Sequence, residues 1–240
     1  MDRDYFAGLD LAQAGEFTAL AVLERSTPPR RHGGGEPPAY ALRHLRRFPI
    51  GTLYAEVAHA LAGVVREGAL GSAPVLADLT GVGRGVLELL RKVLPSGWLV
   101  PVLVTAGHAV GADAQGSYLV PRKELVTCLQ LLLQQRRLRV APALPEADLL
   151  VRELTTFRAK VTPAGAREEE LSWREGAHDD LVLAVALACW WAERHPPWGL
   201  GDIGPGLGES RVPEELRHAF PSLSREEFRR AFPGLSDAYR

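Results

Sequence analysis

The sequence predicts an α/β fold in which a mixed sheet carries helices on its faces. Apolar runs of strand length come first as a meander, and they then alternate with segments of helical spacing. Residues 179–194 are apolar nearly all round, as expected for a helix that is buried. The chain has 240 residues, of which 46% are hydrophobic and 24% charged. This composition is typical of a globular protein.

The first three strands form the meander. Residues 5–11 are apolar and small on both faces, which places this strand in the middle of a covered sheet. Residues 17–24 follow a turn and are expected to pair with it as an antiparallel hairpin. A third strand at 39–48 comes after a Pro-, Gly- and Arg-rich segment, 26–38, which we expect to be an exposed loop.

The remaining elements alternate between helix and strand. Helical spacing predicts helices at residues 52–67, 86–94, from about 122 to about 135, 145–160 and 179–194. Strands are expected at 74–78, 98–105 and 136–140, and loops or turns at 107–116 and 165–176. The composition changes after residue 195. We therefore expect one domain at 1–195, followed at 196–240 by a Pro/Gly-rich linker and a small helical or partly disordered tail.

Four carboxylates lie at the ends of these elements. Asp10 and Asp78 end two strands, at the edge where open α/β sheets bind ligands. If the two strands are parallel neighbours, their backbones lie ~4.8 Å apart, so one carboxyl group is protonated or a cation lies between them. Asp179 and Asp180 begin the buried helix, where one could cap while the other ligates; the spacing leaves open which. Oxygen ligands without a Cys or His cluster favour Mg²⁺ or Mn²⁺ over zinc.

Each acid taken alone has a simpler interpretation, because an aspartate commonly forms a turn or caps a helix. Their combination favours a site that holds two divalent ions and hydrolyses a phosphodiester by in-line displacement. A nucleotide site is a weaker alternative. The glycine-rich turn 81–85 lacks the dinucleotide fingerprint because residue 86 is valine. The sequence also has no Gly-Lys-Ser/Thr triplet of the phosphate-loop type.

Four segments together resemble a known family, the nuclease domain of phage large terminase subunits, which is a branch of the ribonuclease-H-like fold. The resemblance covers roughly residues 5 to 194. The segments are Gly8-Leu9-Asp10, Asp78-Leu79-Thr80-Gly81-Val82-Gly83, Arg122-Lys123-Glu124-Leu125-Val126 and Gly176-Ala177-His178-Asp179-Asp180.

The resemblance implies a five-stranded sheet of order 3-2-1-4-5 and two-metal endonuclease cleavage of double-stranded DNA with Mg²⁺ or Mn²⁺. By position, the implied catalytic metal ligands are Asp10, Asp78, Asp179 and Asp180. Basic residues are expected along the DNA path, some on the helix segment and some on the third strand. They are Lys123, Arg122, Arg46 and Arg47, with Arg43 on the same strand.

Large terminase subunits have an ATPase domain before the nuclease, whereas this chain begins next to its first strand. It is therefore expected to be a stand-alone or split nuclease subunit, a prophage remnant or an excised domain. The tail is expected either to dock a separate ATPase or portal-like packaging partner or to pack on the parent domain, and the sequence leaves both open. The chain has no signal-peptide pattern and no apolar run long enough to cross a bilayer, which predicts a cytoplasmic protein without membrane contact.

Three other functions compete with this prediction. A junction resolvase of the same fold would use the same acids. An actin-like or sugar-kinase-like ATP-binding protein also pairs an early acidic strand with an Asp-Gly turn, but it normally needs two such domains. A non-catalytic scaffold on a retained nuclease fold is disfavoured because all four acids are present. The net charge of −1 argues weakly against a protein that coats DNA without specificity.

Overall fold

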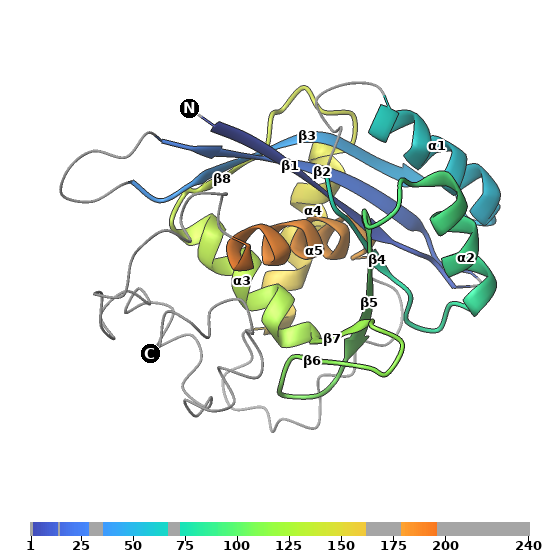
Figure 1. Ribbon diagram of the computed structural model, residues 1–240. Coiled ribbons are helices and arrows are strands. Elements are labelled where there is room, and N and C mark those ends of the chain that lie inside the picture. Colours follow the sequence, from blue (N-terminus) through green and yellow to red (C-terminus); the bar gives the residue numbers. More distant parts are fainter. Residues whose placement is uncertain (1, 14, 29–35, 67–72, 162–178, 196–240) are drawn as a thin grey trace.

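The computed structural model describes residues 2–13, 15–28, 36–66, 73–161 and 179–195 (Figure 1). Three expectations lie partly or wholly outside these ranges. They are the loop at 26–38, the turn at 165–176 and the tail at 196–240. His178 of the final acidic motif also lies outside them. The division into a domain and a tail therefore stays a prediction.

The described strands form one eight-stranded sheet of order β6-β7-β5-β4-β1-β2-β3-β8. Its strands are β1 (Asp2–Asp10), β2 (Thr18–Thr27), β3 (Ala39–Phe48), β4 (Val75–Asp78), β5 (Leu99–Thr105), β6 (Gly111–Ala112), β7 (Tyr118–Pro121) and β8 (Leu138–Arg139). The sheet is mixed, because β1 pairs antiparallel with β2 and parallel with β4. This confirms the predicted α/β class.

The centre of the sheet has the expected ribonuclease-H-like order 3-2-1-4-5, and three further strands extend its two edges. β8 lies within the basic segment predicted as a strand at 136–140. β6 and β7 were not predicted, and β6 lies inside the expected loop at 107–116. β6 consists of two exposed small residues, Gly111 and Ala112, and carries no apolar pattern, while β7 runs directly into α3 without a turn between them.

Helices cover both faces of the sheet (Figure 1). α1 (Tyr54–Arg66) and α2 (Arg84–Val93) pack on one face, in a core with Leu9, Leu20 and Phe48. The opposite face carries α3 (Arg122–Gln134), α4 (Ala147–Val161) and α5 (Asp180–Arg194). Each helix lies within a few residues of its predicted bounds. The two cores keep the central strands apolar on both sides, as their sequences predicted.

α5 is buried from Asp180 to Trp190, which confirms the prediction from its apolar sequence. It crosses β1 at Gly8, where a Cβ atom would lie 1.9 Å from the carbonyl oxygen of Ala184. Its last turn is held by the buried Arg25 of β2, whose Nη1 donates to the carbonyl oxygen of Ala192 at 2.6 Å. The position of α5 on the sheet is therefore fixed by a close backbone approach and by a buried cation at its carboxyl end.

Among the described helices, none combines the length and the apolar character needed to cross a membrane. Cys128 and Cys189 are both free thiols; Cys189 is buried and Cys128 half-buried.

Candidate active site

The first two predicted acids are neighbours across the sheet. Asp10 is the last residue of β1 and Asp78 the last residue of β4, and the parallel register pairs them directly. Their backbones are thus ~4.8 Å apart, the spacing of adjacent strands. Asp78 is buried and Asp10 is half-buried. Two carboxylates so placed repel each other at neutral pH unless positive charge lies between them.

Thr80 holds the Asp78 carboxylate. Its backbone N–H donates to Asp78 Oδ1 at 2.9 Å and its hydroxyl donates to the same oxygen at 2.5 Å. The hydroxyl also accepts the N–H of Val104 in β5 at 2.7 Å. Gly81 follows with a φ of +70°, the left-handed conformation that closes this turn. A side chain two residues beyond the acid therefore fixes its orientation and ties it to the next strand.

Replacement of Thr80 by valine is expected to lower the free energy of unfolding by about 1 kcal/mol, the usual net value of a hydrogen bond. The Asp78 carboxylate and the Val104 N–H both lose their hydroxyl partner, while side-chain volume hardly changes. Thr80→Ser keeps the hydroxyl and should unfold close to wild type. Urea unfolding of both variants measures this, and equal stability of Thr80→Val and wild type would contradict the inferred role.

Asp179 and Asp180 bring two more carboxylates to the same edge. Asp180 is the first residue of α5 and is buried, and Asp179 precedes it as the N-cap residue. Within the described part of the chain, the Asp179 side chain makes no capping hydrogen bond to its own helix. Its Oδ2 instead accepts a hydrogen bond from Nη2 of Arg122, the first residue of α3. Arg122, which the sequence predicted near DNA, thus lies directly at the acids.

The negative charges of the other three acids all act on Asp10, so the four acids form one cluster. Burial raises the pKa of Asp10 well above its usual value, and the negative charges of Asp78, Asp180 and Asp179 raise it further. Arg122 opposes this shift. Burial also raises the pKa of Asp78, although the hydrogen bonds from Thr80 lower it. The predicted residues therefore act on one another as a group with an excess of negative charge.

The donor set fits a hard divalent cation, because it consists of carboxylate oxygens and carries unbalanced negative charge. The described residues nevertheless contain no group of three or more His, Cys, Asp or Glu side chains already arranged as a metal-binding shell. Oδ1 of Asp78 accepts a hydrogen bond from Thr80, and Oδ2 of Asp179 accepts one from Arg122. Metal coordination by these residues stays a prediction.

Glu153, a buried residue of α4 that contacts the first turn of α5, was not predicted from the sequence. Its Oε2 accepts the N–H groups of Leu181 and Val182 at 3.1 and 3.3 Å. Burial raises the pKa of Glu153 to about 7, the hydrogen bond from Val182 opposes this, and the charge of Asp180 adds to it. The available signal was a charged residue in the apolar stripe of a helix, beside Leu150.

The basic residues predicted along the DNA path are not gathered in one place. Lys123 is exposed at the start of α3. Arg46 is exposed and stacks over Phe48 at 4.3 Å, on the face of the sheet covered by α1 and α2. Arg47 turns to the other face, where Nη1 lies 3.2 Å from Oε1 of Glu153. A role in DNA binding stays a prediction for each of them.

Arg43 is also engaged within the protein. It is the extra residue at the register shift between β2 and β3, and its Nη2 lies 2.9 Å from Oε1 of the buried Glu24. The three arginines of β3 therefore do not form a single basic strip.

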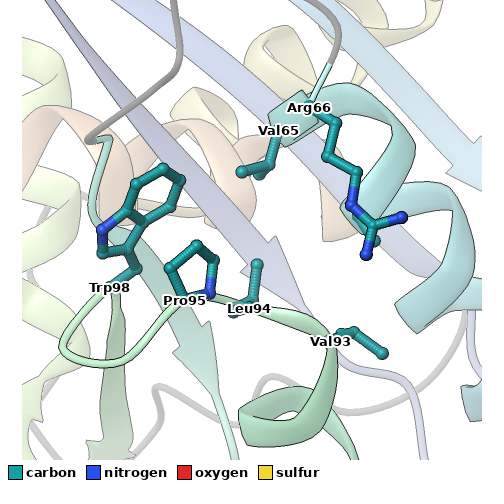
Figure 2. A pocket seen from close by; sticks show the side chains of 7 residues that line it. Val65, Arg66, Val93, Leu94, Pro95 and Trp98 are labelled. Carbon is teal, nitrogen blue, oxygen red and sulfur yellow. The ribbon is translucent and has the colours of Figure 1, made fainter.

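One shallow pocket lies away from the acids. It is formed where α1 and α2 end and just before β5 begins (Figure 2). The strands β4 and β5 begin on this side of the sheet, whereas Asp78 lies at the opposite end of β4. Its lining is Ala62, Val65, Arg66, Val93, Leu94, Pro95 and Trp98. It contains none of the predicted site residues.

Comparison with known proteins identifies a structural neighbour but no sequence family. No model of a protein family matches this chain, and a search of curated proteins finds no match either. Among solved structures, one match is described as the "Crystal structure of the large terminase nuclease from thermophilic phage G20c". It shares 21% identity, with 78% of this chain and 81% of that chain covered, at a TM-score of 0.48. A likeness at this level carries no argument about function, so the fold assignment rests on the order and register of the strands described above.

Proposed function

We propose that this protein is a divalent-metal-dependent endonuclease that hydrolyses phosphodiester bonds of double-stranded DNA by a two-metal mechanism. The observation that carries the proposal is the meeting of four acids from three separate elements at one edge of the sheet. Such a cluster opposes folding because its charges repel one another. A role in holding cations accounts for it better than a purely structural role does.

The residues proposed to hold the two ions are Asp10, Asp78 and Asp180, with Asp179 as a further ligand. Asp180 is buried at the start of α5, and its negative charge acts on Asp10. Mg²⁺ or Mn²⁺ bound there would activate water as the nucleophile and stabilise the charge on the leaving oxygen. Double-stranded DNA as the substrate rests on the resemblance of the sequence motifs to terminase nucleases.

The chain's own groups contribute the rest of the proposed mechanism. Thr80 holds Asp78 in a fixed orientation through its hydroxyl and backbone N–H. Arg122 neutralises part of the negative charge of the cluster, and it would lie beside a DNA phosphate that binds the proposed cations. Lys123, exposed at the same end of α3, is proposed to contact the DNA backbone. Docking of an ATPase or portal-like partner through the tail is a further prediction.

The test is cleavage of a supercoiled plasmid. Wild-type protein with Mn²⁺ is expected to yield nicked and linear products, EDTA should abolish them, and Asp78→Ala should lower the rate by about 100-fold or more. Asp148→Ala is the matched control, because Asp148 is an exposed aspartate of α4. Its rate should equal that of wild type. Full activity of Asp78→Ala would contradict the proposed site, and running a four-way junction beside the plasmid would separate a resolvase from a duplex nuclease.

A further inference from the structure

The helix that carries Asp180 is capped by a residue from another helix. The first N–H groups of an α-helix have no partner within the helix, and they are usually satisfied by the side chain of the N-cap residue. In α5, Oε2 of Glu153 accepts the N–H groups of both Leu181 and Val182. Glu153 comes from α4, 28 residues before Leu181. The first turn of α5 is therefore anchored by a tertiary contact.

Because Glu153 binds these N–H groups, the Asp179 carboxylate does not serve as the N-cap of α5. Aspartate is a favoured N-cap residue, so Asp179 would ordinarily use its carboxylate for the first turn. Here that carboxylate binds Arg122, and Glu153 supplies the cap. The hydrogen bonds that hold the first turn of α5 therefore do not involve the Asp179 carboxylate.

Arg47 completes the anchor from the sheet. Its Nη1 donates to Oε1 of Glu153 at 3.2 Å. One oxygen of the Glu153 carboxylate therefore binds β3, and the other binds α5. The guanidinium also stacks over the ring of Phe17 at 4.1 Å. The side chains of Arg47 and Glu153 are only 19% and 4% exposed. A buried ion pair seldom stabilises a protein more than apolar packing does, so this pair is better explained by the geometry that it imposes.

We propose that Glu153 and Arg47 are positioning residues, which fix the first turn of α5 and thereby hold Asp180 toward Asp10 and Asp78. This inference rests on the proposed function, because it assigns a role toward the metal-binding acids. It also gives Arg47 a role inside the protein in place of the predicted contact with DNA. Neither residue touches the reacting atoms.

The first test compares Glu153→Ala with wild type in two measurements on the whole chain. Amide hydrogen exchange without metal should show faster exchange at Leu181 and Val182, since both N–H groups lose their acceptor. Calorimetric titration with Mn²⁺ alone should show about a tenfold or greater loss of affinity, the usual effect of removing a group that orients metal ligands. Glu153→Gln keeps one acceptor oxygen for α5 and is expected to recover part of both properties. It also keeps the test decisive if Glu153→Ala fails to fold.

Leu150→Ala controls for simple loss of stability. Leu150 lies one turn before Glu153 on α4 and is fully buried, so its truncation destabilises the same helix. Its folded form should nevertheless bind Mn²⁺ as wild type does. Equal Mn²⁺ affinity of Glu153→Ala and wild type would overturn the proposal. Failure of wild-type protein itself to bind Mn²⁺ would refute the metal site, and the positioning role with it, which is a distinct outcome.

The second test separates positioning from DNA binding by means of two adjacent arginines. Arg47→Ala should weaken Mn²⁺ binding severalfold and leave the salt dependence of duplex binding in EDTA unchanged. Arg46→Ala should leave Mn²⁺ affinity unchanged, because Arg46 lies on the opposite face of the sheet. If Arg47→Ala instead weakens the salt dependence of duplex affinity and leaves Mn²⁺ affinity unaltered, Arg47 contacts DNA and the positioning role is wrong.

Discussion

Replacing Gly8 by alanine is expected to destabilise the fold by about 3 kcal/mol or more, at the upper end of the cost of overpacking a core. The added Cβ would lie 1.9 Å from the carbonyl oxygen of Ala184 and 3.2 Å from the backbone nitrogen of Ala188. Both are helix backbone atoms, so no change of side-chain rotamer can relieve the contact. α5 would have to move away from β1, and Asp180 would move with it.

Thermal unfolding measures this effect. A loss of about 3 kcal/mol lowers the Tm by roughly 6–12 °C in a domain of this size. Gly63→Ala is the matched control. Gly63 lies inside α1, and a Cβ there meets no atom within 4 Å. That substitution should raise stability by roughly 0.5–1 kcal/mol, because alanine is the better helix former. A Tm of Gly8→Ala equal to that of wild type would mean that α5 can shift at no cost.

The part of the fold that could be predicted is the part encoded by local pattern. The run of apolar residues before Asp10 placed β1 at the centre of the sheet, and the apolar stretch after Asp179 identified a buried helix. β6 could not be predicted, because its residues, Gly111 and Ala112, are small and exposed and give no apolar pattern. The contact of Gly8 with Ala184 is also invisible in sequence, since it joins residues far apart in the chain.

The candidate site divides in the same way. Asp10 and Asp78 were placed correctly at strand ends, because an acid that ends an apolar run is a local signal. Glu153 was missed because it acts on α5 from another helix. The ion pair of Asp179 with Arg122 was not predicted for a related reason, since the sequence does not show which basic side chain lies beside an acid in the fold.

The alternation of β3 predicts that its adjacent arginines lie on different faces of the sheet. Successive residues of a strand point to opposite faces of the sheet. Arg46 and Arg47 were both expected beside DNA, yet their side chains lie on opposite faces, over Phe48 and Phe17 respectively. Strand alternation alone separates them, whereas only the tertiary structure shows Glu153 as the partner of Arg47.

Asp10→Asn is expected to have opposite effects on activity and on metal-free stability. Loss of a carboxylate from the proposed metal site should lower the rate of plasmid cleavage by about 100-fold or more. In EDTA the same change removes one charge from a repelling cluster. The pKa of Asp10 is raised by burial and then by Asp78, Asp180 and Asp179, so its ionised form opposes folding at neutral pH. A gain of about 1 kcal/mol would raise the Tm by roughly 2–4 °C.

The pH dependence identifies the cause of this gain. Because the pKa of Asp10 is higher in the folded than in the unfolded state, its protonation favours folding, and that contribution is lost as the pH rises through the folded-state value. The Tm difference between Asp10→Asn and wild type, measured in EDTA, should therefore be small near pH 4 and grow toward pH 7. Asp148→Asn, an exposed aspartate outside the cluster, should show no such growth.

Mn²⁺ should reverse the order of stability. A cation that binds only the folded state raises the Tm of the protein that holds it, and it should do so for wild type far more than for Asp10→Asn. The variant would then be the more stable protein in EDTA and the less stable one in Mn²⁺. Cleavage by Asp10→Asn at the wild-type rate would remove Asp10 from the site. An unchanged order of Tm values in the two conditions would mean that the cluster of acids does not bind the ion.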